Sequence, residues 1–454
     1  MHRREFLKMT AGSTLTLGVS PSPGGGSSRW IGAGDRVRIG VVGIRGMGQT
    51  HIEEFSRLPN VEVAALCDVD ENLFPEIIKK HFADRGRPTP KTYFDLRRLY
   101  EDKDIDAVSV VTPNHWHALA GIWAMQAGKH VTIEKPVCHN FFEGQKLVEA
   151  ARRYKVIVQH GMEQRSNPGA RSAVEFMHKG GLGEVYLAKG LCYKWRNTIG
   201  HLDDEPAPAG VHYDLWLGPA PQRPFNRNRF HYNWHWNWDY GNGDIGNQGV
   251  HEMDVARWGL GVTLPTRVTA SGGHFMFADD QQTPNMLMAV FEFENPEGGA
   301  DKKKVLQFEV RGWITNREAG IGEGRGDSDS GYMVSDANTV GNIFYGSKGY
   351  MAKDVNAWKT YLGKKLEPGP SGKGQANHYQ NFVEAIRAGN GSLANGDISE
   401  GHYSAALVHL ANISYRLGRS LRFDPKNERF IGDEEANQLL RRNYRAPFVV
   451  PEKP

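Results

Sequence analysis

Cysteine is scarce in this chain. Three cysteines occur among 454 residues, and Cys67, Cys138 and Cys192 form no C-x-x-C pair. Such a sparse and odd set argues against a disulfide framework. It fits a protein that folds in a reducing compartment.

Long apolar runs and an excess of charge are also missing. No apolar run reaches 18 residues, so we expect no insertion into a membrane. The 55 basic residues nearly balance the 52 acidic ones, and a net charge of +3 does not favour a nucleic-acid partner. A globular chain of this length is too long for one ordinary core, which predicts two domains with extensions.

The N-terminus carries a possible export signal. Residues 3–8 read RREFLK, the form of a twin-arginine signal, and a Ser, Pro and Gly-rich linker covers residues 20–28. We expect residues 1–34 to be signal and flexible linker, and the protein to be periplasmic or otherwise exported. Because His2 replaces the usual Ser or Thr and no clear cleavage site follows, an accidental arginine pair is the alternative.

Strand and helix patterns alternate over residues 35–160. This alternation predicts βαβ units and a parallel, doubly wound α/β sheet. The expected strands cover 36–43, 61–67, 107–111, about 130–134 and 156–159, and the expected helices cover 49–58, 118–128 and 141–154.

From about residue 185 the expected strands follow one another with few helices between them. Over residues 161–420 this predicts an α+β domain for substrate binding and oligomerisation, with an open-faced, mostly antiparallel sheet. Residues 315–335 are expected to be loop, and 421–454 a tail with little core signal. The strands are expected at 184–191, 266–272, 286–294, 304–312 and 341–345, and two late helices at 376–388 and 399–417.

A glycine-rich turn joins the first strand to the first helix. Glycines allow a pyrophosphate to approach the backbone, and the helix N-terminus offers N–H donors, so this context predicts a Rossmann dinucleotide site. The spacing is G-x-x-G-x-G instead of the usual G-x-G-x-x-G. The turn residues predicted to contact the cofactor are Gly43, Arg45, Gly46, Met47 and Gly48.

Asp68 ends the second strand, where an acid can accept hydrogen bonds from the adenosine ribose. A carboxylate there disfavours a 2′-phosphate, so we expect NAD, with NADP less favoured. The alternative is that Asp68 caps a helix. Arg45 leaves a second alternative open, because it can meet either a 2′-phosphate or the pyrophosphate.

Lys135 ends a β-branched run and is followed at once by Pro136. A lysine at the end of a buried strand needs a partner or a function, and this edge of an α/β sheet binds ligands. The bland alternative is a surface lysine that opens a turn. Besides the glycine turn and Asp68, we predict cofactor contacts in the 112–117 segment and at this strand end. They are Thr112, Asn114, His117, Glu134 and Lys135.

Four motifs in this order resemble the Gfo/Idh/MocA oxidoreductases. They are RIGVVG with GMG, CD at the end of the second strand, TPNHWH, and EKP. The family's C-terminal motif, roughly D-x-G-x-H-x-x-D, has a near match in residues 247–254, NQGVHEMD. The resemblance covers about residues 35–420. It implies hydride transfer between a sugar or polyol carbon and a nicotinamide.

The resemblance and the chemistry select the same catalytic residues. Imidazole suits removal of a hydroxyl proton, which makes His251 the candidate base, and Lys135 can stabilise the alkoxide or shuttle the proton. A purely structural histidine is the alternative. Asn247 stands where the family usually has Asp, so we hypothesise that His251 stays neutral at pH 7. Asn247 contacting the sugar directly is the other interpretation.

Several residues are candidates for substrate binding. Arg165 follows the sixth strand and can bind hydroxyls or form a salt bridge between domains. Aromatic rings of the 230–238 run can stack on sugars, or seal the sheet or a subunit contact. His231 and His235 hint only weakly at a metal, and we expect none. The predicted substrate contacts are Arg165, Trp236, Trp238 and His378.

Three functions remain open. The first is an exported oxidoreductase that acts on a sugar, glycoside or polyol hydroxyl and keeps NAD(H) tightly bound, because NAD is not replenished outside the cytoplasm. The second is an NAD-dependent glycoside hydrolase that works by oxidation, elimination, hydration and reduction. The third is a non-catalytic sugar-binding relative. A homo-oligomer is expected from the open sheet face.

Overall fold

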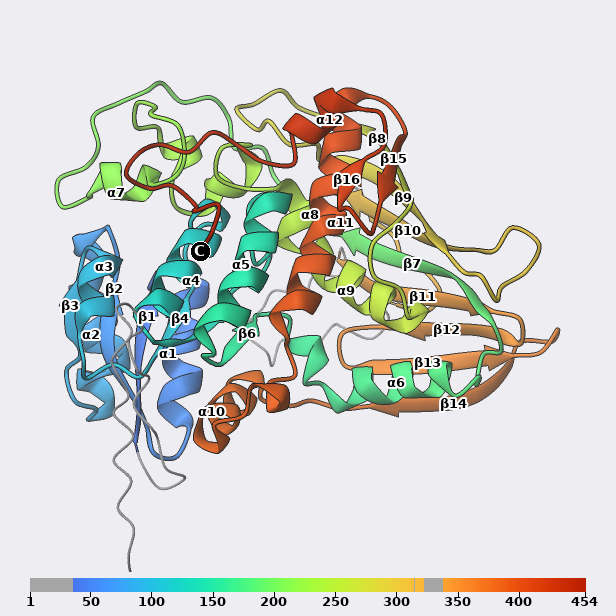
Figure 1. The fold of residues 1–454 in the computed structure, drawn as a ribbon, viewed down its shortest axis with the longest axis horizontal. Coiled ribbons are helices and arrows are strands. Elements are labelled where there is room, and N and C mark those ends of the chain that lie inside the picture. Colours follow the sequence, from blue (N-terminus) through green and yellow to red (C-terminus); the bar gives the residue numbers. More distant parts are fainter. Residues whose placement is uncertain (1–35, 314, 322–337) are drawn as a thin grey trace, which may run out of the picture.

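A computed structural model describes residues 36–454 of the chain, apart from residue 314 and residues 322–337. The predicted export signal and linker, and most of the predicted 315–335 loop, lie outside the described residues. Figure 1 shows two sheets side by side, with helices packed between them.

The smaller sheet is parallel and six-stranded, with the order β3-β2-β1-β4-β5-β6. This is the order of dinucleotide-binding folds and confirms the predicted doubly wound sheet. Its central strands are buried on both faces, which is why they show nearly continuous apolar runs, whereas the edge strand β3 is mostly exposed and was not predicted. The strands of this sheet are β1 (Val37–Val42), β2 (Val61–Cys67), β3 (Lys91–Tyr93), β4 (Ala107–Val110), β5 (His130–Ile133) and β6 (Val158–His160).

Five helices accompany this sheet in the described part of the chain. The helix predicted over 118–128 starts earlier, at Asn114, so the last four residues of the TPNHWH motif form its first turn instead of a preceding loop. That helix is buried nearly all round, which removes the one-sided pattern that marks a helix start. The helices are α1 (Met47–Arg57), α2 (Phe74–His81), α3 (Leu96–Glu101), α4 (Asn114–Gln126) and α5 (Phe141–Tyr154).

The larger sheet is mostly antiparallel, as predicted, and has ten strands among the described residues, in the order β14-β13-β12-β11-β7-β10-β9-β8-β15-β16. One neighbouring pair, β7 with β10, is parallel. The strands are β7 (Val185–Tyr193), β8 (Arg267–Gly273), β9 (Met286–Glu294), β10 (Lys303–Arg311), β11 (Thr339–Gly346), β12 (Gly349–Lys353), β13 (Ala357–Leu362), β14 (Glu367–Lys373), β15 (Leu421–Asp424) and β16 (Arg429–Phe430).

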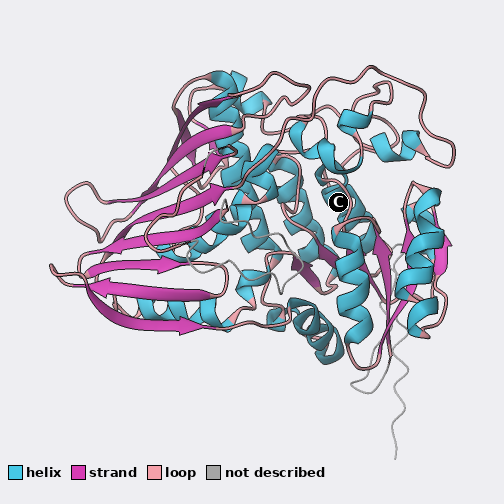
Figure 2. Ribbon diagram, turned by 180° about the vertical axis from the view of Figure 1, so that it is seen from behind, coloured by secondary structure: helices cyan, strands magenta, loops and turns pink. Residues whose placement is uncertain are grey.

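Helices cover one face of this sheet, and Figure 2 shows the other face, which no described helix covers. Helix α11 stands between the two sheets and packs on α5, α9 and β8 (Figure 1). None of the described helices is long and apolar enough to cross a membrane. The remaining helices are α6 (Pro168–His178), α7 (Tyr213–Leu217), α8 (Gly243–Asn247), α9 (Gly249–Leu260), α10 (His378–Ala388), α11 (Ile398–Leu417) and α12 (Glu434–Gln438).

The end of the chain is packed, contrary to the expectation of little core signal over 421–454. Strand β15 pairs with β8, and Phe423 and Phe430 are buried in the core of the larger sheet. Phe448 packs against Trp116 of α4, with ring centroids 5.4 Å apart. These apolar residues are spaced too widely to form a periodic pattern, so their burial depends on distant partners.

Candidate active site

A cavity of about 820 Å³ lies where the carboxyl ends of the parallel strands meet the larger sheet. The segments that follow β1, β2, β4, β5 and β6 all contribute to its lining. Helix α9 and strands β11 and β12 close it from the other side. In an open α/β sheet this edge is where ligands bind.

The glycine turn forms one end of the cavity. Gly43 has φ +85°, and a Cβ there would lie 2.6 Å from the carbonyl oxygen of Val111. A Cβ on Gly48 would lie 2.0 Å from the carbonyl oxygen of Gly43, so Gly48 is needed for packing and does not line the cavity. Around Gly46 the space is open for 4 Å. The turn therefore leaves room for a pyrophosphate beside the first turn of α1.

Asp68 lies beside the glycine turn and lines the same cavity. Its carboxylate accepts hydrogen bonds from the backbone N–H groups of Ile44, at 2.9 Å, and Asp70, at 3.0 Å. Burial raises the pKa of Asp68 to about 6, although these hydrogen bonds favour its charged form. Each carboxylate oxygen keeps a lone pair for a ribose hydroxyl. Asp70, not Asp68, caps the short helix that follows.

Thr112, Asn114 and His117 line the cavity near the N-terminus of α4. The His117 ring nitrogens lie 2.6 Å from the carbonyl oxygen of Pro136 and 2.7 Å from that of Thr112. Burial lowers the pKa of His117. The ring thus connects the ends of β4 and β5 and positions the segment that holds Lys135.

Glu134 is buried behind Lys135 and fixes its backbone. Its carboxylate accepts from the Lys135 N–H at 3.0 Å and lies 3.0 Å from Nε2 of His51. Burial would raise the pKa of Glu134, but the His51 hydrogen bond and nearby positive charge hold it at about 2. Glu134 therefore carries a negative charge next to the candidate catalytic lysine.

The Lys135 side chain reaches across the cavity to the 247–254 segment, which holds His251. Its Nζ donates to the main-chain carbonyl oxygen of Asn247, 2.6 Å away. His251 lies in the first turn of α9 and lines the same cavity. The two predicted catalytic side chains therefore share one cavity, although one follows a strand of the parallel sheet and the other lies on helix α9.

His251 is nearly buried, with 13% of its side chain exposed, and its Nδ1 lies 3.5 Å from a carboxylate oxygen of Glu163. Burial lowers the pKa of His251, the carboxylate of Glu163 opposes this shift, and Lys135 adds to it. The direction of the shift favours a neutral imidazole at pH 7, the form that accepts a proton.

Asn247 also belongs to a polar group on the cavity wall. Its amide nitrogen lies 3.3 Å from Oδ1 of Asp244 and 3.5 Å from the Tyr232 hydroxyl. Asp244 forms a two-pronged ion pair with Arg196, at 2.7 and 2.8 Å. The carboxylate beside Asn247 is therefore that of Asp244, and Arg196 already neutralises it.

The aromatic run forms a short 3₁₀ helix over His231–Trp236 and presents different rings from those predicted. Tyr232 and Trp234 line the cavity. Trp236 is instead buried, with the Arg196 guanidinium over its ring, and Trp238 packs under Arg416. Contrary to the prediction, Trp236 and Trp238 therefore do not line the cavity, because each ring packs against an arginine elsewhere.

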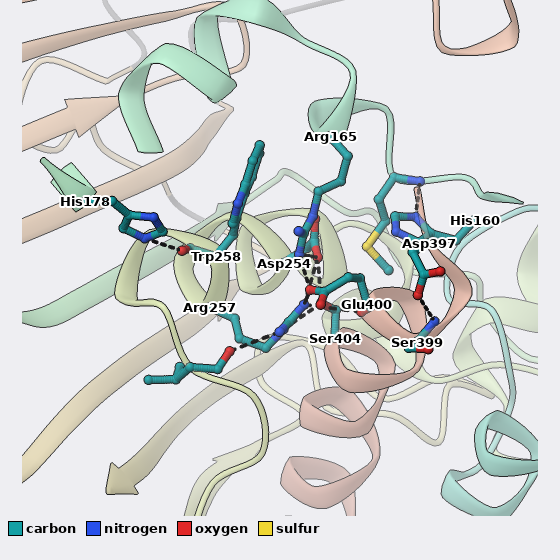
Figure 3. A network of polar contacts seen from close by, with 12 residues as sticks. His160, Arg165, His178, Asp254, Arg257, Trp258, Asp397, Ser399, Glu400 and Ser404 are labelled. Carbon is teal, nitrogen blue, oxygen red and sulfur yellow. Dashed lines mark hydrogen bonds and ion pairs between the residues drawn. The ribbon is translucent and has the colours of Figure 1, made fainter. Parts of the chain in front are cut away.

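Arg165 does not line the cavity; it forms a buried ion-pair network (Figure 3). Its guanidinium donates two hydrogen bonds to Asp254, both 2.8 Å long, and one to Glu400 at 3.0 Å. Arg257 pairs with the same Glu400. The salt-bridge interpretation of Arg165 therefore describes this structure, and the predicted substrate contact does not.

His378 lies beyond the cavity and lines a neighbouring one of about 430 Å³. Its Nδ1 is 2.6 Å from the Ser166 hydroxyl, and its Nε2 is 2.7 Å from the carbonyl oxygen of His160. Both ring nitrogens are therefore engaged. Among the described residues, no group of three or more His, Cys, Asp or Glu side chains is arranged to hold a metal ion.

Two family models match the chain. Residues 37–162 match the oxidoreductase family's NAD-binding Rossmann fold, and residues 180–275 and 333–450 match its C-terminal alpha/beta domain. The chain belongs to the Gfo/Idh/MocA oxidoreductase family. The open glycine turn and Asp68 fit the nicotinamide cofactor that this family's Rossmann domain binds, which confirms the predicted NAD.

Similar proteins extend this picture. A Glycosyl hydrolase family 109 protein of Shewanella sp. (strain W3-18-1) is 35% identical over 173 residues, which cover 34% of this chain and 37% of that protein. The related protein of Shewanella baltica (strain OS195) is 34% identical over the same length. The chain thus matches little more than a third of the length of these relatives.

Solved structures of low sequence identity share the fold. A levoglucosan dehydrogenase in complex with NADH and levoglucosan has a TM-score of 0.63 and 16% identity, covering 86% of this chain and 99% of that one. The WlbA dehydrogenase from Bordetella pertussis in complex with NADH and UDP-GlcNAcA has a TM-score of 0.61 and 18% identity, covering 86% and 98%.

The C-terminal domain of this Gfo/Idh/MocA chain adds polar residues to the cavity that the sequence did not indicate. Two of them belong to the 247–254 motif but were assigned no role there, and the other four lie on strands of the larger sheet or follow β7, where no local motif marks them. They are Lys194, Arg196, Gln248, Glu252, Asn342 and Lys353.

Proposed function

We propose that this protein is an exported oxidoreductase that transfers a hydride between a sugar, glycoside or polyol carbon and tightly bound NAD(H). The observation that carries the proposal is the shared cavity. The glycine turn and Asp68 line one end of it, and Lys135 and His251 line another part. A cofactor on the first pair and a hydroxyl on the second would meet within one enclosed space.

The chain's own residues supply the proton chemistry. The bound nicotinamide provides the hydride acceptor. His251, whose pKa burial lowers, removes the hydroxyl proton, and the ammonium group of Lys135 stabilises the charge that develops on the oxygen. The Asn247 carbonyl and Glu134 position that lysine from opposite sides.

NAD is proposed in preference to NADP because the Asp68 carboxylate would repel a 2′-phosphate. Arg45 lines the same end of the cavity and is proposed to meet the pyrophosphate. Export is proposed from the RREFLK segment at residues 3–8. An exported enzyme keeps its cofactor and recycles it within the site.

A second function is supported by the Shewanella relatives named for glycosyl hydrolase family 109. In this alternative the same pair of residues would oxidise a ring carbon, the aglycone would be eliminated, water would add, and the ring would be reduced again. The reaction then has no net redox change. A non-catalytic sugar-binding relative is the third possibility.

The first experiment separates the enzymes from the binding protein. The purified protein is denatured, and the released nucleotide is identified by absorbance and chromatography. We expect NAD or NADH in near-stoichiometric amount. A preparation without nucleotide that also fails to bind added NAD would reject both enzymatic functions.

A second experiment separates the two enzymatic functions. Chromogenic glycosides are offered to the protein without added NAD, and free sugars are offered while the absorbance of reduced nicotinamide is followed. A sugar-dependent rise in this absorbance supports the oxidoreductase. Release of the aglycone without lasting reduction supports the hydrolase.

A further inference from the structure

The wall of the cavity formed by the larger sheet carries two ammonium groups that form no direct ion pair with a carboxylate of the described residues. Lys194 directly follows β7, and Lys353 is the last residue of β12. Both line the cavity, and neither forms an ion pair with any carboxylate in the described part of the chain. This distinguishes them from Arg196 on the same wall, which Asp244 neutralises.

Lys353 is buried, with 2% of its surface exposed. Its Nζ donates to the side-chain oxygen of Gln164 and to the carbonyl oxygen of Asp354, both at 2.9 Å. Both acceptors are uncharged. A buried ammonium group without a direct ion-pair partner is costly. Desolvation lowers the pKa of Lys353 to about 8, although the charges of Asp354, Glu252 and Glu163 oppose this shift. A ligand anion would remove that cost.

Free hydrogen-bond donors remain on both lysines. An ammonium group has three N–H donors, of which Lys353 uses two. Lys194 uses one, in a 2.9 Å hydrogen bond to the Gln248 side-chain oxygen. Together the two lysines can satisfy both oxygens of a carboxylate, or several oxygens of a phosphate.

Glu252 is linked to Lys194 through Gln248, interacts electrostatically with Lys353, and carries an unused atom. Its Oε1 accepts from Gln248 at 3.1 Å, whereas its Oε2 is buried and has no hydrogen-bond partner among the residues that the structure describes. Burial raises the pKa of Glu252 to about 8, so at neutral pH its carboxyl group is protonated and can donate. A protonated carboxyl group does not repel an anion.

We infer that Lys194, Glu252 and Lys353 form a subsite for an anionic group, and that the substrate is an acidic sugar. The inference rests on the proposed function and deepens it by giving the substrate class. The anionic group is a carboxylate or a phosphate. Held on this wall, it would orient the sugar while Lys135 and His251 act on a hydroxyl-bearing carbon.

The test uses the purified, cofactor-loaded protein and matched sugars. Glucose, glucuronate and glucose 6-phosphate form one set, and galactose and galacturonate form another. Binding is measured by calorimetry and oxidation by nicotinamide absorbance. We expect at least one anionic sugar to bind at least tenfold more tightly than its neutral partner. The set also tells a carboxylate from a phosphate.

Substitutions locate the effect. Lys194→Met and Lys353→Met are each expected to raise Kd or KM for the anionic sugar at least tenfold, with little change in kcat. Lys359→Met removes an exposed lysine from the neighbouring strand β13 and should change neither value. If the buried Lys353→Met variant does not fold, the half-buried Lys194 still tests the subsite.

The outcomes distinguish this inference from the proposed function. Oxidation of neutral sugars as efficiently as of acidic ones overturns the inference and leaves the function standing. Tight, lysine-dependent binding of acidic sugars without oxidation supports the inference and counts against the function. Failure of every sugar to bind counts against both.

Discussion

The ammonium nitrogen of Lys135 lies 2.6 Å from the main-chain carbonyl oxygen of Asn247. The contact joins residues 112 positions apart and connects the end of a parallel strand to the segment that leads into His251. A main-chain acceptor holds the lysine without neutralising it. The charge therefore remains available to a developing alkoxide.

Replacing Lys135 tests that role. Lys135→Met keeps the length of the side chain but removes the charge, and we expect kcat to fall by about 10²–10³-fold. Bound nucleotide and the circular dichroism spectrum should be unchanged. Lys304→Met is the matched control. Like Lys135, Lys304 donates to a main-chain carbonyl oxygen, that of Leu260 at 2.7 Å, but it lies outside the cavity. Full activity of Lys135→Met would remove Lys135 from the mechanism.

Asn247→Asp tests whether the missing charge keeps His251 neutral. A carboxylate in this part of the cavity would favour the imidazolium form, so the acidic limb of the kcat/KM profile should move upward by about one pH unit. Asn247→Leu, which has similar size and no charge, should not move it. An unchanged profile in Asn247→Asp would contradict the hypothesis.

Asp68 predicts how cofactor binding depends on pH. Its pKa is raised to about 6, so the carboxylate becomes protonated as pH falls through 6 and loses its preference for ribose hydroxyl donors. We expect the affinity for NAD to decline over that range. Asp68→Asn should bind NAD about tenfold more weakly near pH 8 and lose the pH dependence. Titration of NADH fluorescence measures both effects, and Asp84→Asn on the surface is the control.

Arg165 is expected to contribute to the stability of the fold and not to substrate specificity. Arg165→Ala removes the two-pronged partner of the buried Asp254 and leaves it Arg257, 3.7 Å away, which should lower the free energy of unfolding by about 3–5 kcal/mol in a urea titration. Arg165→Lys should lose less, and Arg171→Ala, which removes an exposed arginine of α6, should lose little. Equal stability of all three variants would contradict the role of the network.

The Arg165–Asp254 ion pair also determines the direction in which stability changes with pH. Burial would raise the pKa of Asp254, but Arg165 and Arg257 hold it far below its usual range in the folded protein. A carboxylate with a depressed folded pKa stabilises the fold above its unfolded pKa of about 4 and loses that contribution as the pH falls below it. Arg165→Ala should therefore differ most from the unsubstituted protein at neutral pH and less in acid.

The first sheet was predictable because its signals are local. Buried parallel strands give continuous apolar runs, and the glycine turn, Asp68 and Lys135 all stand at strand ends. The edge of one sheet brings such residues together, so a linear sequence suffices to group them. His251 was reachable only through its motif, because its helix α9 is buried nearly all round and lacks a one-sided pattern.

The sheet-side wall of the cavity was not predictable in the same way. Lys194 and Lys353 are 159 positions apart, and strands β7, β11 and β12 bring them to one cavity. An antiparallel sheet sets such neighbours by long-range pairing, which no local spacing reveals. Arg165 illustrates the same limit, since its partners Asp254 and Glu400 come from two later helices.

Helix α10 gives the cofactor domain an unusual dependence on the end of the chain. Phe382 and Ile386 share a core with Ile39 and Phe55, so residues of the first strand and helix stay partly uncovered until the ribosome has made more than 380 residues. Such distant contacts slow folding. The domain that holds the nucleotide site is thus synthesised first, but its core is complete only after α10 has been made. A fragment that ends at residue 160 would expose the apolar surface that α10 covers.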